Sequence, residues 1–154
     1  MRVLVFSSLL SLVALFAVLR GGAPERIVGV ALLLAFAATV GLQQPFATRF
    51  LSIEWGVFAA DAILLVVLVG VALYADRFWP LWLAAFQTLG TLGHLVRGLD
   101  HGIAPVAYAI LLASWSYPMI LLLAIGTARH INRRRRGRAR DWSGGELALP
   151  AASS

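Results

Sequence analysis

The sequence predicts an all-α protein, a polytopic transmembrane helical bundle with five spans. Of its 154 residues, 60% are apolar and 13% are charged, and the mean hydropathy is +0.85. A soluble domain of this size is near half apolar and a quarter charged, so one small core could not bury this much apolar surface. The apolar residues form continuous runs without strand-like alternation, and lipid-exposed backbone must close its hydrogen bonds within each segment. These observations favour membrane helices.

Five apolar runs separated by short polar segments are the predicted spans. The first two, 3–19 and 27–42, are marginal for a helix that needs about 20 residues to cross a bilayer. The third covers 55–74, the fourth, 81–99, is the most polar, and the fifth, 103–127, is long enough to tilt. Residues 1–128 therefore form the predicted bundle. Four spans are the alternative, with the fourth or second run failing to cross.

The first run has the position of a signal peptide, but we interpret it as a retained span. Arg2 followed by an apolar stretch fits the beginning of such a peptide. Residues 17–23, however, lack a convincing small-x-small cleavage site, and the apolar run is long for a signal sequence. Cleavage remains the alternative.

Charge asymmetry predicts the orientation. All 13 basic residues are arginine, and seven of them lie in the last 26 residues: Arg129, Arg133, Arg134, Arg135, Arg136, Arg138 and Arg140. With five spans, ten arginines share the side of the C-terminus, against Arg2, Arg49 and Arg97 on the other side. Because basic loops stay in the cytoplasm, we expect the C-terminus there, and residues 129–154 to form a basic, mostly disordered tail. The absence of lysine is typical of a GC-rich bacterial genome, so the expected location is a bacterial inner membrane.

The basic tail predicts contact with anionic lipid at the cytoplasmic face of the bilayer. It begins where the last span ends, and each arginine near a membrane surface contributes about 1 kcal/mol of attraction. Lipid contact accounts for the cluster, so no nucleic-acid partner is expected. The other expected partners are further membrane subunits or copies of the same chain.

An intramembrane polar cluster is predicted where the third and fourth spans form a hairpin. At 100° per residue, the polar side chains of the fourth run share one face, and we expect that face to avoid lipid. Reflection about the short turn brings Asp61 to the depth of His94 and Arg97, so we predict that Asp61 pairs with one of them. The candidate cluster comprises Asp61, Gln87, Thr91, His94, Arg97 and His101. It either fixes the register of two helices or lines a proton or ion path.

The fifth run predicts a kink and offers a weak case for a cofactor. Pro118 leaves the Ser114 carbonyl without its helical donor, which favours a bend there. Tyr108 and Trp115 share a face on which a quinone could stack, although aromatic packing is the favoured interpretation. His94 and His101 are about 10.5 Å apart along a helix and cannot both ligate one haem iron. We therefore expect no cofactor and no metal site.

Three functions remain open from the sequence. We favour a non-catalytic accessory or assembly subunit of a larger membrane complex, because the chain contains no catalytic motif that we can identify and no catalytic residues are predicted. Such a subunit would contact its partners through the polar stripe of the fourth run and the small residues Ala31, Ala35 and Thr39. The first alternative is a small oligomeric transporter or channel-like protein with Asp61, His94 and Arg97 along its path. The second is a haem- or quinone-associated redox subunit.

Overall fold

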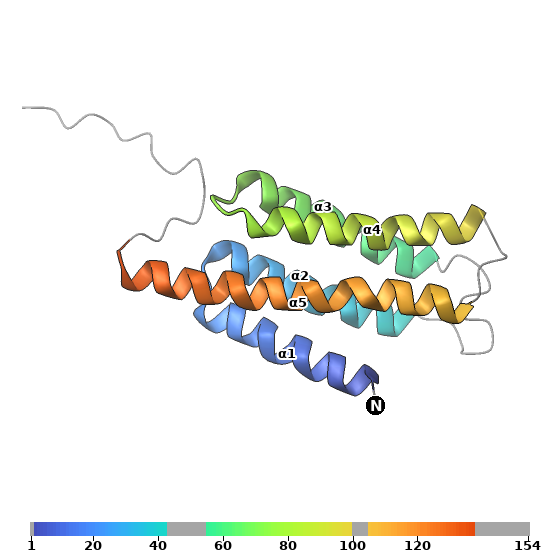
Figure 1. Ribbon diagram of the computed structural model, residues 1–154, viewed down its shortest axis with the longest axis horizontal. Coiled ribbons are helices and arrows are strands. Elements are labelled where there is room, and N and C mark those ends of the chain that lie inside the picture. Colours follow the sequence, from blue (N-terminus) through green and yellow to red (C-terminus); the bar gives the residue numbers. More distant parts are fainter. Residues whose placement is uncertain (1, 43–54, 100–104, 138–154) are drawn as a thin grey trace, which may run out of the picture.

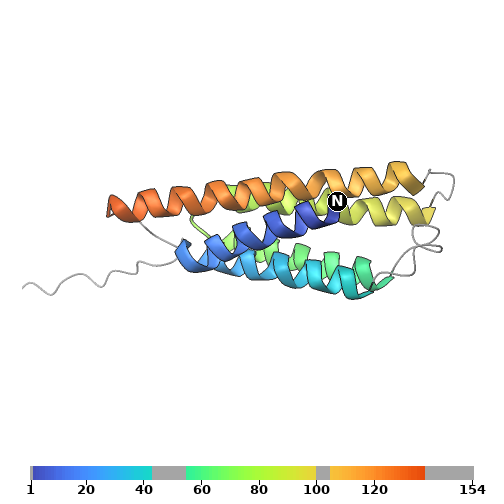
Figure 2. The same ribbon diagram turned by 90° about the horizontal axis from the view of Figure 1, so that it is seen from below.

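The computed structural model describes residues 2–42, 55–99 and 105–137, with the side chains of 3–42, 55–94 and 114–137. These residues form five helices and no strand, which confirms the all-α class. The helices are α1 (Arg2–Arg20), α2 (Ala23–Leu42), α3 (Trp55–Tyr74), α4 (Trp79–Leu99) and α5 (Pro105–Arg135). Helices that are consecutive in the chain run antiparallel along one long axis, with α1 tilted relative to the others (Figures 1 and 2).

The helices close into a ring in chain order. Each helix packs on the next, α5 returns to α1, and α2 also reaches α5 across the interior. The short turns after α1 and α3 and the C-terminal end of α5 lie at the same end of the bundle (Figure 1). We call this the basic end, because it gathers Arg20, Arg26, Arg77 and the arginines of the last turns of α5. Helix order and antiparallel packing thus bring together charges that are far apart in the sequence.

Apolar surface dominates the outside of the bundle. Large apolar side chains within the helices, such as Leu12, Val66 and Leu73, are 67–71% exposed. So much exposed apolar surface is unusual for a soluble monomer and matches a protein dissolved in lipid. In the described part of the chain, α1, α2 and α3 are long and apolar enough to cross a membrane. These three helices support a membrane location.

Leucines from several helices fill the centre of the bundle, and small residues allow close helix approach. Leu68 of α3, Leu83 of α4 and Leu123 of α5 are fully buried. A Cβ atom at Gly29 of α2 would lie 3.3 Å from the Ala14 carbonyl oxygen of α1. Small residues here let the two backbones pack closely, as in membrane helix pairs. Ala31 and Ala35 of α2 are partly buried against the same core.

Helix boundaries differ from the predicted spans mainly at the basic end. The third span coincides with α3, but α2 begins at Ala23, before the predicted start at 27, because Pro24 and Glu25 suit a first helical turn. Helix α5 continues past the predicted end at 127 to Arg135, so the first part of the predicted tail is helical. Arginine is a good helix former and is favoured near a helix C-terminus, which accounts for the extension. Residues 138–154, which include Arg138 and Arg140, lie outside the described residues.

Candidate functional site

The first polar group, the Asp61 cluster, consists of Asp61 on α3 with Gln87 and His94 on α4. Nε2 of His94 lies 2.9 Å from Oδ2 of Asp61. Nε2 of Gln87 donates to Oδ1 of the same carboxylate at 3.2 Å and to the Asp61 carbonyl oxygen at 3.3 Å. The Asp61 side chain is 22% exposed, and that of His94 is 7% exposed. Both oxygens of the carboxylate are thus engaged by one neighbouring helix.

The polar stripe of α4 therefore points into the bundle. Gln87, Thr91 and His94 are all buried, and the hydroxyl of Thr91 donates to the Gln87 carbonyl oxygen of its own helix at 2.9 Å. Gln87 and His94 of this stripe contact Asp61 of α3. Because all three side chains are buried, they cannot also contact a second subunit in this arrangement. Asp61 pairs with His94, one of its two expected partners. The side chain of Arg97 and all of His101 lie outside the described residues.

Aromatic rings contact His94 of this cluster and Trp115 in the middle of α5. The ring of Phe58 meets His94 edge-on at a centroid distance of 6.3 Å. Trp115 stacks on Phe86 of α4 at 5.9 Å with an interplanar angle of 27°. This stacking supports the packing interpretation of Trp115 over a quinone platform, while the Tyr108 side chain lies outside the described residues. Pro118 is inside α5, which continues through the Ser114 to Pro118 segment as helix.

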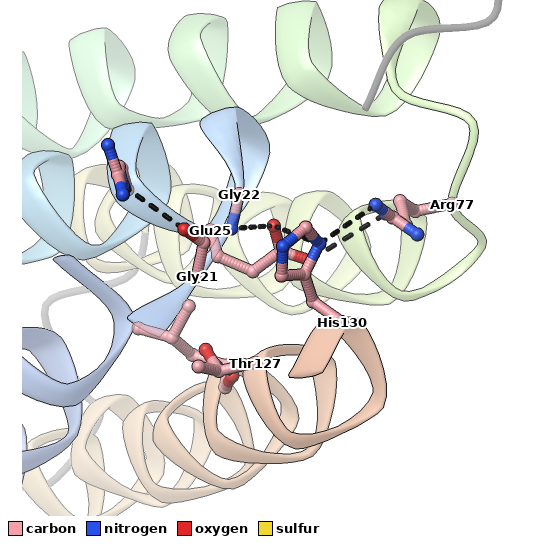
Figure 3. A network of polar contacts seen from close by, with 8 residues as sticks. Gly21, Gly22, Glu25, Arg77, Thr127 and His130 are labelled. Carbon is pink, nitrogen blue, oxygen red and sulfur yellow. Dashed lines mark hydrogen bonds and ion pairs between the residues drawn. The ribbon is translucent and has the colours of Figure 1, made fainter. Parts of the chain in front are cut away.

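The second polar group, the Glu25 cluster, was not predicted from the sequence. Glu25 at the start of α2, Arg77 in the turn between α3 and α4, and His130 near the end of α5 meet at the basic end (Figure 3). Oε1 of Glu25 lies 3.7 Å from Nε of Arg77, and both side chains are at most 1% exposed. Nη2 of Arg77 lies 3.2 Å from Nδ1 of His130. Three separate parts of the chain thus meet in one buried cluster.

Glu25 also caps the N-terminus of α2, directly after the turn that follows α1. The Gly22 N–H donates to Oε2 of Glu25 at 3.1 Å, which is the side-chain half of a capping box at the beginning of α2. A Cβ atom at Gly21 would lie 2.4 Å from the Ala17 carbonyl oxygen and 2.5 Å from Cβ of Glu25. Only glycine fits at this position without a rearrangement of the turn. The local structure therefore aims the carboxylate inward, toward Arg77.

The geometry determines which nitrogen of His130 carries its proton. Nδ1 lies 3.2 Å from Arg77 and 4.0 Å from Oε2 of Glu25, and a guanidinium can only donate. Nδ1 therefore accepts, and the proton is on Nε2. The 4.0 Å approach to Glu25 is too long for a hydrogen bond and needs no proton on Nδ1. The imidazole thus adds an acceptor for Arg77 and leaves Glu25 as the counter-charge of the cluster.

Further arginines crowd the same end of α5. Burial, followed by repulsion from the Arg77 guanidinium, lowers the pKa of Arg133 from its ordinary value. Arg134, Arg135 and Arg136 are exposed, and Arg129 is exposed one residue before the buried His130. The basic end thus has a buried, neutralised interior and an outer layer of arginines. Such an outer layer is suited to contact with anionic groups.

An apolar layer separates the two clusters. Thirteen residues of α3 lie between Asp61 and the end of the helix near Arg77, which corresponds to about 20 Å. Leu64, Leu68 and Val71 fill this interval on α3. In the segments 62–76 and 79–93 of the described hairpin, the only Asp, Glu, His or Arg is Asp76, an exposed residue at the basic end. A proton relay through the hairpin would have to cross this layer without a titratable carrier.

The described residues contain no group of three or more His, Asp and Glu side chains that could hold a metal ion. Comparisons of the chain with protein-family models, with curated proteins and with solved structures give no match.

Proposed function

We propose that this protein is a small integral membrane protein that serves as a non-catalytic accessory or assembly subunit of a larger membrane complex. All five helices cross a bacterial inner membrane in this proposal, with the N-terminus outside and the basic end in the cytoplasm. The observation that carries it is that the Asp61 cluster and the Glu25 cluster each bind helices of the same chain to one another. Asp61 joins α3 to α4, and Glu25 joins α2 to Arg77, which in turn contacts His130 of α5.

This arrangement suits a structural role better than solute transport. The apolar layer between the clusters supports this choice, since a transporter needs polar or titratable groups across the membrane depth. The polar stripe of α4 is occupied inside the bundle, so a partner would contact the apolar outer faces. Packing between such faces in lipid depends on shape complementarity. Association would therefore require small or well-matched surfaces on the partner.

Purification from the source cell in a mild detergent tests the accessory role. We expect a second membrane polypeptide to remain with the tagged chain at a fixed ratio through detergent exchange and size-exclusion chromatography. A chain that travels alone, or only with copies of itself, contradicts the proposal. The absorbance of the purified protein near the haem Soret band checks the redox alternative at the same time.

A flux measurement separates the accessory role from transport. In vesicles that contain the purified chain, we expect proton and ion flux no greater than in empty vesicles. Asp61→Asn and Asp76→Asn make the same chemical change, but only the first alters the Asp61 cluster. Flux higher than in empty vesicles would contradict our proposal if Asp61→Asn abolished it and Asp76→Asn preserved it. That result would favour the transport function.

A further inference from the structure

An open depression of about 540 Å³ lies at the basic end, between the beginning of α2 and the last turns of α5. One wall is the turn backbone of residues 21–23, and the others come from Arg26, Ile27, His130 and Arg134. The residues thus come from two segments that are more than a hundred positions apart, and helix packing alone brings them together. The depression is large enough to accept a phosphate group and part of a glycerol moiety.

The lining is positively charged, and the nearby acid does not cancel that charge. Arg26 and Arg134 contribute two cations. Glu25 is adjacent in sequence to Arg26, but its carboxylate is fully buried, accepts the Gly22 N–H and is paired with Arg77. The N-terminus of α2 is accordingly occupied by this carboxylate. The net charge that faces the depression comes from the two arginines.

Arg26 is held in place, and Arg134 is available. Nε of Arg26 donates to the Gly21 carbonyl oxygen at 3.1 Å, which fixes the side chain against the turn. This bond uses one of five guanidinium donors, so the others can still bind an anion. Arg134 is exposed on the turn of α5 that follows His130. Arginine is the residue best suited to bind phosphate oxygens in pairs.

An exposed apolar stripe leads away from the depression along α2. Ile27 is 41% exposed, Val30 is 44% exposed and Leu34 is 66% exposed. Positions 27, 30 and 34 share one face of a helix, and Ile27 also lines the depression. A cationic depression that continues into an apolar face matches a molecule with an anionic head and a hydrocarbon tail. A small soluble phosphate compound would leave the stripe unused.

We propose that this depression binds the phosphate headgroup of an anionic membrane phospholipid between Arg26 and Arg134, with an acyl chain along Ile27, Val30 and Leu34. The inference rests on the proposed membrane placement, in which the basic end lies at the cytoplasmic surface. It goes further than general attraction of a basic tail, because it assigns one bound lipid to two particular arginines.

Native mass spectrometry of the full chain, released from mixed micelles of phosphatidylglycerol and phosphatidylcholine, tests the site. The informative variant is Arg26→Gln with Arg134→Gln. Its matched control is Arg135→Gln with Arg136→Gln, which removes the same charge from exposed positions outside the depression. We expect the first pair to lower retention of phosphatidylglycerol about tenfold or more, and the control pair to lower it less than about threefold.

Equal losses from both pairs would overturn the site and leave only diffuse attraction to the basic end. Arg134→Gln alone supplies a variant that leaves the Arg26 bond to Gly21 intact, and it should still lower retention more than Arg136→Gln alone. Inorganic phosphate that displaces the lipid at millimolar concentration would instead identify a site for a soluble phosphate compound. Co-purification with a partner measures the accessory role separately, so either proposal can fail while the other stands.

Discussion

The carboxylate of Glu25 and the guanidinium of Arg77 form a buried pair in which Oε1 and Nε are 3.7 Å apart. One residue begins α2, and the other lies in the turn between α3 and α4, so the pair connects two helical hairpins. Removing two charges from water has a large desolvation cost, and the pair therefore adds less net stability than its Coulomb attraction suggests. Removing only one partner is strongly destabilising, because the remaining charge stays buried without its counter-charge.

Glu25→Gln should destabilise the fold strongly. The amide can still accept the Gly22 N–H, so the capping bond is kept, but Arg77 loses its buried counter-charge. Removal of one partner from a buried pair costs about 3 to 5 kcal/mol, and we expect a loss near the lower figure. Unfolding in mixed detergent micelles, followed by circular dichroism, measures the change.

Asp76→Asn is the matched control, since Asp76 is adjacent to Arg77 but exposed. It removes the same charge from the same turn without uncovering a buried group, so its unfolding curve should overlay that of the wild type. Similar losses for both variants would show that the general charge of the turn, and not the buried pair, stabilises this end.

A double-mutant cycle on Asp61 and His94 should give a favourable coupling energy. Asp61→Ala, His94→Ala and the double variant remove the hydrogen-bonding groups and isolate the 2.9 Å contact from the other roles of each side chain. Hydrogen bonds between membrane helices contribute about 0.6 kcal/mol on average and up to about 1.7 kcal/mol, and we expect a value toward the upper end. Additive single effects would mean that the contact contributes no stability of its own.

The Asp61 contact could be anticipated from the sequence, whereas the Glu25 contact could not. A short turn between two apolar runs fixes an antiparallel hairpin, so the depth of His94 opposite Asp61 follows from counting residues. Glu25, Arg77 and His130 belong to three different segments, and their meeting depends on which helices are neighbours around the ring. Counting along the chain does not supply that order. The one available signal was a glutamate three residues after Gly22, in the position of a capping residue.

The helix ends at the basic end were also difficult to predict from hydropathy. Apolar runs define the part of a helix that suits lipid, but Ala23 to Arg26 and Arg129 to Arg135 are helical without being apolar. Their polarity led to a predicted loop and a predicted disordered tail. Helix formation there is decided by backbone preference, capping and the packing of His130 against Arg77, none of which hydropathy measures.

Gly126→Ala should destabilise the contact between α5 and Trp79. A Cβ atom at Gly126 would lie 2.7 Å from Cε2 of the buried indole, which is too close for a carbon contact. Overpacking of this kind costs about 1 to 3 kcal/mol. Gly90→Ala is the control, because a Cβ atom there meets nothing within 4 Å and alanine is the better helix former. We expect it to stabilise the protein by about 0.4 to 1 kcal/mol.

Trp79→Phe provides a second check on the same contact. The smaller ring should relieve the clash, so Gly126→Ala should cost less in the Trp79→Phe background than in the wild type. An equal cost in both backgrounds would place the effect of Gly126→Ala elsewhere, for example in the backbone of α5.

Cysteine labelling should place Thr48 and Gly102 on the periplasmic side of the membrane and Phe78 and Ser143 on the cytoplasmic side. The chain contains no cysteine, so each position can be replaced singly by cysteine and treated with a membrane-impermeant maleimide. Phe78 is 71% exposed in the turn at the basic end, whereas the other three positions lie outside the described residues. We expect labelling of Thr48→Cys and Gly102→Cys in intact cells, and of the other two only after permeabilisation. The physical reason is the arginine excess at the basic end, because arginines next to membrane spans favour the cytoplasmic side.

Gly102 is the decisive position, because it follows α4, which contains the most polar of the five predicted spans, 81–99. Gln87 and His94 of α4 contact Asp61 of α3 inside the bundle, and the exposed side chains of α4 include Trp82, Leu89 and Leu92. Folding as a hairpin with α3 would thereby lower the cost of inserting α4 into lipid. Protection of Gly102→Cys in intact cells together with labelling of Thr48→Cys would mean that α4 does not cross, and the chain would then have four spans.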